Sequence, residues 1–97
     1  MTCHSLKKPY RNAAYLRWVK TLPSAISRRP SDDAHHLIGH NQGGIGTKAP
    51  DLFVFPLTRD EHAELHNMGW KEWEELYGSQ WMHVAKTLQL AVIEGVL

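Results

Sequence analysis

The chain has 97 residues, of which 42% are hydrophobic and 22% charged, and its formal net charge at pH 7 is +1. This length predicts a single domain, residues 1–97, whose small core often needs support from a metal ion or a partner. No apolar run is long enough for a membrane span, and the N-terminus lacks a signal-peptide core, so we expect a cytoplasmic protein with no membrane partner. The single cysteine, Cys3, excludes an internal disulfide.

Charge is unevenly distributed along the chain. Residues 1–30 carry seven basic side chains and no acidic one, whereas the charged side chains in residues 60–75 are mostly acidic. Residues 1–10 are expected to form a basic arm. A basic segment of this kind is a candidate surface for nucleic-acid phosphates, although a solvated face is an equally good interpretation of the charges alone.

The first half of the chain predicts one helix and a strand pair. Asn12 is a favourable N-cap for a short helix over residues 13–20. Residues 24–34 have the composition of a turn flanked by two short strands. Residues 39–50 contain four glycines and predict a long loop, and long ordered loops are often functional. The apolar residues 52–55 predict the second strand.

Three helices are expected in the second half. Thr58 and Glu61 have the spacing of a capping box, which predicts the start of a helix that carries His62 and His66. Residues 70–97 predict two further helices. The last of these has an apolar stripe that should pack on the core, formed by Trp81, Val84, Leu88, Ala91 and Val92. The predicted fold class is therefore α+β, with an N-terminal helix and C-terminal helices around a small strand–strand–helix unit.

Five of the seven histidines fall in two clusters, at residues 35–40 and 62–66. Histidine is the commonest metal ligand and readily transfers protons near neutral pH. Positions i and i+4 share a helix face, so His62 and His66 can reach one ion. Successive strand residues point to opposite faces, so His35 and His36 can have different roles, one facing an ion and the other a water molecule.

The order of these motifs carries a likeness to a known family. The motifs are residues 35–49, 51–53 and 56–57, and the His-x-x-x-His spacing at 62–66. Weaker similarity extends from residue 10 to residue 97. In these residues the chain resembles the HNH, or His-Me finger, nucleases. More narrowly, it is similar to the phage and prophage group that includes the RecA-dependent nuclease Ref.

The resemblance implies a ββα-metal core over residues 35–66 that binds one divalent ion, Mg²⁺, Mn²⁺ or Zn²⁺. The implied metal ligands are His35, His62 and His66. His36 would be the general base that takes a proton from the attacking water, and Asp51 would orient it. Three protein ligands leave positions open for substrate and water, and the ion would stabilise negative charge that develops on the phosphate.

The chain departs from the family at a second metal site. Relatives commonly carry two Cys-x-x-Cys pairs that hold a structural zinc. The matching positions here lack thiolates, so no structural zinc is expected; they are Ser24, Ser27, Thr58 and Glu61. In place of this zinc site, we expect packing of the C-terminal helix and of four tryptophans to stabilise the domain: Trp18, Trp70, Trp73 and Trp81.

The expected function is hydrolysis of DNA phosphodiester bonds by a metal-dependent endonuclease in a bacterial host cell, encoded by a phage or prophage. DNA would be the partner, together with a RecA-type recombinase filament if the protein acts in recombination. The expected nucleic-acid contacts are Lys7, Lys8, Arg11, Arg28, Arg29, His40 and Lys48. His83 is expected at the surface. The alternatives are an inactive DNA-binding or recombination accessory protein and a protein-interaction module, and the oligomeric state stays open.

Overall fold

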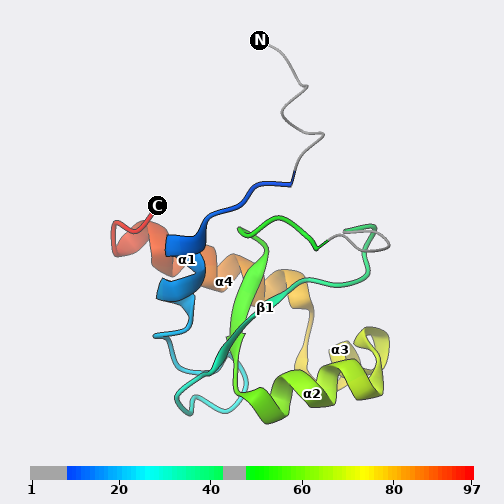
Figure 1. The fold of residues 1–97 in the computed structure, drawn as a ribbon. Coiled ribbons are helices and arrows are strands. Elements are labelled where there is room, and N and C mark those ends of the chain that lie inside the picture. The colour runs from blue at the N-terminus through cyan, green and yellow to red at the C-terminus, as the bar shows by residue number, and fades with distance from the viewer. Residues whose placement is uncertain (1–8, 43–47) are drawn as a thin grey trace.

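The computed structural model describes residues 9–42 and 48–97. Within them, the chain forms an α+β fold with two strands and four helices, which confirms the predicted fold class (Figure 1). The elements in chain order are α1 (Ala13–Val19), β1 (Asp33–His36), β2 (Val54–Leu57), α2 (Arg59–Met68), α3 (Trp70–Tyr77) and α4 (Gln80–Ile93). No helix in these two stretches is long and apolar enough to cross a membrane.

The two strands form an antiparallel sheet that is covered on both faces. His35 lies opposite Phe55, and His36 lies opposite Val54. Phe55 packs in one hydrophobic cluster and Val54 in another, as the alternation of strand side chains requires. All four residues of β2 are buried because each face of this strand meets a separate layer of helix.

One layer contains α2, α3 and the first part of α4, and the other contains α1 and the later part of α4. Trp73 and Leu65 are fully buried in the first cluster, against Phe55. Tyr15 of α1 and Ala91 of α4 enclose the second. Figure 1 shows α4 running behind the sheet from the α2–α3 side to α1. The long C-terminal helix therefore joins both halves of the core.

Helix starts agree with the sequence more closely than strand limits do. Thr58 and Glu61 form the predicted capping box at the start of α2. Strand β2 begins two residues after the predicted start and includes Pro56. Strand β1 begins within residues 24–34, at Asp33, and an isolated bridge between Pro23 and Pro30 takes the place of the other strand predicted there. A two-stranded sheet accepts proline because each strand is an edge. The backbone N–H of Ala25 donates a hydrogen bond to the Pro56 carbonyl at 2.9 Å.

The apolar stripe of α4 and the tryptophans are only partly internal. Val84 and Ala91 are buried as predicted, but Val92 is 65% exposed. Trp73 is fully buried, whereas Trp81 is 37% exposed and lies beside the rings of Phe53 and His40. Of the four tryptophans expected to take the place of a zinc site, Trp73 is fully buried, and Trp18 and Trp70 are partly buried against the two clusters.

The four positions that match the cysteine pairs form a hydrogen-bond network instead. The buried Ser24 hydroxyl donates to Glu61 Oε1 at 2.5 Å and accepts from the backbone N–H of Ser27 at 3.2 Å. The same carboxylate oxygen accepts from the Thr58 backbone at 2.8 Å. Burial alone would raise the pKa of Glu61, but hydrogen bonds from Ser24, Ser27 and Thr58 lower it. An ionised carboxylate thus ties the turn at residues 24–27 to the start of α2.

His83 is buried, so its predicted surface position is wrong. It is 6% exposed, and its Nε2 lies 2.8 Å from the Tyr77 carbonyl oxygen. Its ring packs against those of Phe55 and Trp73, at centroid distances of 5.2 and 5.7 Å. Burial lowers its pKa, against the opposing effect of the Tyr77 hydrogen bond. His83 lies on the buried side of α4, at the i, i+3 and i+4 spacing that also includes Gln80, Val84 and Thr87.

Candidate metal centre and catalytic cleft

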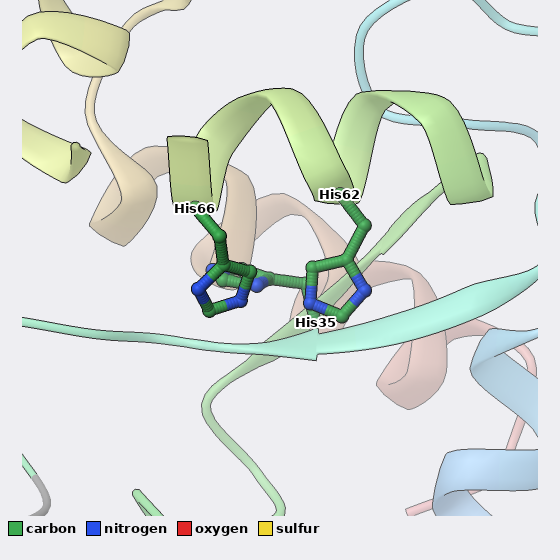
Figure 2. Close-up of side chains that lie close together, drawn as sticks. All are labelled: His35, His62 and His66. Carbon is green, nitrogen blue, oxygen red and sulfur yellow. The ribbon is translucent and has the colours of Figure 1, made fainter. Parts of the chain in front are cut away.

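Three histidines from two elements meet on the α2 side of the sheet. Figure 2 shows His62 and His66 extending from one face of α2 toward His35 on β1. One possible ligand atom from each of the three lies within 4.8 Å of the others. Nitrogens that bind one ion at about 2.0–2.1 Å are about 3–4 Å apart, so small ring movements would close this cluster around a cation.

His35 is a buried histidine with one ring nitrogen that has no hydrogen-bond partner among the described residues. The residue is 1% exposed, and that nitrogen is Nδ1. Burial lowers its pKa to about 3, with further repulsion from His62 and His66, while a hydrogen bond to Gln80 opposes the shift. A neutral, unpartnered ring nitrogen is costly in a core but is the form that binds a metal.

A carboxylate outside the cluster orients His62. Its Nδ1 lies 3.0 Å from Oδ2 of Asp33, two residues before His35 on the same strand face. Arg59 donates to the other Asp33 oxygen at 3.0 Å. Burial alone would raise the pKa of Asp33, but hydrogen bonds from Arg59 and His62 lower it. A carboxylate that accepts from one histidine nitrogen aims the other nitrogen, as in many metal sites. Burial and His62 also lower the pKa of His66.

His36 points to the other face of β1 and pairs with Asp51. Its Nε2 lies 2.7 Å from Asp51 Oδ1, and Asp51 is 4% exposed. Burial alone would raise the pKa of Asp51. Hydrogen bonds from His36 and the Asn12 backbone, and the charges of His36 and Arg11, lower it below its ordinary value. The carboxylate is therefore ionised and accepts the Nε2 proton of His36, so the free lone pair of the neutral ring would be on Nδ1.

The segment before α1 holds Asp51 in place. Its carboxylate accepts from the backbone N–H of Asn12 at 2.8 Å and from Arg11 at 3.1 Å. Arg11 also donates to the carbonyls of Ala49 and Lys48, at 2.7 and 3.2 Å. The acidic partner of His36 is thus fixed by residues about 40 positions earlier in the chain.

Both histidine groups open into one cleft of about 620 Å³. The three clustered histidines and His36 line it, as do Lys20 and Lys48. The cleft also contains apolar side chains, among them Leu16 of α1. The cluster of three histidines, His36 and two lysines therefore line one volume.

Of the seven residues expected to contact nucleic acid, the five that the structure describes lie in different surroundings. Lys7 and Lys8 lie outside the described residues. Arg11 is engaged by Asp51 and the two carbonyls, and His40 contacts Glu74 Oε2 at 2.8 Å, so internal contacts occupy both. Arg28 and Arg29 are exposed but do not line the cleft, whereas Lys48 does.

Three residues of the site were not among those predicted. Asp33 had a signal, because it shares a strand face with His35. Lys20 lay at the end of a predicted helix, and nothing in the sequence indicated the direction of its side chain. Gln80 contacts His35 across 45 positions of sequence and had no local signal.

The fold and site together define a small α+β domain in which three histidines could hold a metal ion near a partly buried His–Asp pair. The chain belongs to the family described as "Protein of unknown function (DUF968)", whose model matches residues 5–95.

The chain is also similar to a curated protein. The chain is 53% identical over 83 residues to a protein of Escherichia coli (strain K12) named "Uncharacterized protein YdfU". The match covers 86% of this chain and 24% of that protein, so the chain spans about a quarter of its relative's length. No solved structure matches the chain.

Proposed function

We propose that β1, β2 and α2 form the ββα-metal core of an HNH-type nuclease that hydrolyses phosphodiester bonds in DNA. The observation that carries the proposal is the shared cleft, which joins the His36–Asp51 pair to the cluster of His35, His62 and His66. Each half alone has ordinary structural interpretations. A polarised imidazole beside a three-histidine cation site has few uses other than the activation of water on a substrate that carries negative charge.

In the proposed reaction, His36 is the general base. Its Nδ1 removes a proton from a water molecule, whose oxygen forms a bond to phosphorus as the bond from phosphorus to one ester oxygen breaks. The proton on Nε2 stays in the 2.7 Å hydrogen bond to Asp51, so the imidazolium that forms faces an ionised carboxylate. Asp51 thereby fixes the tautomer of His36 and stabilises its charged form.

The cation site has the donor set that the reaction needs. A divalent ion held by His35, His62 and His66 would supply positive charge to offset the negative charge that develops on the phosphate oxygens. Lys20 and Lys48 on the same cleft provide further positive charge for the DNA backbone. The expected link to a phage, to recombination and to a RecA-type filament belongs to this proposal and rests on the sequence resemblance.

The test is cleavage of supercoiled plasmid and of single-stranded DNA with Mg²⁺, Mn²⁺ or Zn²⁺, with and without a RecA filament. We expect nicked product that chelator abolishes, and loss of product in His62→Ala. His83→Gln is the matched control, because it removes a histidine outside the cluster and retains a donor for the Tyr77 carbonyl.

Failure of the parent protein to cut under all these conditions would refute the nuclease proposal. DNA binding without cutting would then favour an accessory protein that uses the same basic cleft. Absence of both activities would favour a protein-interaction module.

A further inference from the structure

We infer that Gln80, the first residue of α4, is a positioning residue for His35: its amide fixes which ring nitrogen carries the proton and leaves Nδ1 bare for the cation. This inference rests on the proposed metal site. Gln80 is fully buried, and its Oε1 lies 3.0 Å from His35 Nε2. It comes from the C-terminal helix, outside the strand–strand–helix unit that carries the three histidines.

The backbone of Ile38 determines the orientation of the Gln80 amide. Gln80 Nε2 donates to the Ile38 carbonyl at 2.9 Å, and the Ile38 N–H donates to Gln80 Oε1 at 3.2 Å. A reversed amide would place two donors together at one contact and two acceptors at the other. Glu74 Oε2 lies 3.4 Å from Gln80 Nε2 and would repel an oxygen there. Oε1 is therefore the atom that faces His35.

The tautomer of His35 follows from this orientation. An amide oxygen accepts and cannot donate, so His35 Nε2 must carry the proton. A neutral imidazole has only one such proton, so Nδ1 is left with a free lone pair. That nitrogen is the buried atom without a partner among the described residues. Gln80 thus sets the ring in the form in which it can bind a metal before any ion arrives.

Gln80 is itself held in place by α3 and by the turn after β1. Glu74 Oε2 accepts from the Gln80 backbone N–H at 3.0 Å and from His40 Nε2 at 2.8 Å. Burial alone would raise the pKa of Glu74, but hydrogen bonds from Gln80 and His40 lower it. The C-terminal helices therefore contribute a polar support to the metal site in addition to apolar packing.

The first test is the tautomer of His35 in the parent protein. Long-range ¹H–¹⁵N correlation spectra at pH 7, recorded in chelator, should show His35 with its proton on Nε2. This measurement needs neither metal nor activity, so it stands even if the cleft cuts no DNA. A proton on Nδ1 in the parent would overturn the inference.

The second test is metal affinity in Gln80→Leu, which keeps similar volume but removes the acceptor. We expect affinity for Zn²⁺ and Co²⁺ to fall about 10- to 100-fold, and His35 to lose its single tautomer. Gln89→Leu, the same change on the exposed side of α4, should alter neither property. Unchanged affinity in a folded Gln80→Leu protein would refute the role. Failure of the parent to bind either ion would instead refute the proposed metal site. The spectra would still show which nitrogen of His35 carries the proton.

Discussion

At the scale of single residues, the two adjacent histidines have different neighbours, and we expect them to have different roles. His35 faces the metal cluster and His36 faces Asp51, because β1 turns successive side chains to opposite faces. His36→Ala should therefore reduce DNA cleavage at least about a hundredfold while metal affinity stays unchanged. His35→Ala should weaken metal affinity itself, with partial recovery of cutting in excess metal.

Plasmid-nicking rates and calorimetric titration with Mn²⁺ would measure these two effects. Asp51→Ala should give an intermediate rate, since it acts through His36. Parent-like cleavage by His36→Ala would reverse the assignment of base and ligand.

The buried histidines predict a pH dependence of stability for the metal-free protein. Burial lowers the pKa of His35 to about 3 and also lowers that of His83. The unfolded chain takes up a proton near pH 6.5, which the folded chain resists. The free energy of unfolding should therefore be highest above pH 6.5 and fall on acidification, by up to about 1.4 kcal/mol per pH unit for His35.

Urea denaturation in chelator between pH 7 and 5 would measure this slope. The carboxylates with lowered pKa values lose their contribution only below about pH 4.5, so they do not affect that window. His83→Gln should show a shallower slope than the parent. Stability that is constant or rises from pH 7 to 5 would contradict the assigned burial.

At the scale of elements, the turn after β1 is tightly fitted to α3. Gly39 has φ of +75°, and a Cβ there would lie 2.2 Å from the Trp70 ring. Gly39→Ala should therefore destabilise the protein through both backbone strain and a clash. Gly95 has nearly the same φ, +74°, with nothing within 4 Å of its Cβ position. Gly95→Ala should cost only the backbone strain, about 1–2 kcal/mol.

Chemical denaturation of the two variants would give the difference between them, which isolates the contact with Trp70. Equal losses of stability would mean that the ring moves aside at no cost. A change in tryptophan fluorescence confined to Gly39→Ala would show where the clash is relieved.

Local signals predicted the helices and the histidine pairs, whereas long-range contacts were not accessible from sequence. Thr58 and Glu61 define a helix start through bonds between neighbours, and the i, i+4 spacing places His62 and His66 on one face. The support of His35 by Gln80 spans 45 positions and depends on how α4 packs, which no local pattern encodes. The limits of β2 were missed because proline in a strand is acceptable only once the sheet is known to be two-stranded.

At the scale of the whole molecule, the positions of the cationic side chains predict where DNA lies. Lys20 and Lys48 line the cleft, whereas Arg28 and Arg29 are exposed elsewhere. Reversing both lysines to glutamate should reduce the slope of log affinity against log salt by about two, since each phosphate contact contributes close to one. Reversing both arginines is the matched control and should change it less.

Fluorescence anisotropy with a labelled oligonucleotide across a series of salt concentrations would measure both slopes. A larger loss in the arginine variant would place DNA on the turn at residues 24–29, away from the histidines. That result would separate DNA binding from the proposed chemistry.

Residues 10–12 restrain Asp51 through hydrogen bonds, so removal of the N-terminal segment would affect the cleft. The Tyr10 carbonyl accepts the Asp51 N–H at 2.9 Å, and Asn12 donates to its carboxylate. A truncated fragment that starts at Ala13 would keep every histidine of the cleft and still lose the restraints on Asp51. It would also lose the Asn12 cap of α1. If the cleft has the proposed activity, protease trimming of the first dozen residues should lower that activity irreversibly while every clustered histidine stays in the chain.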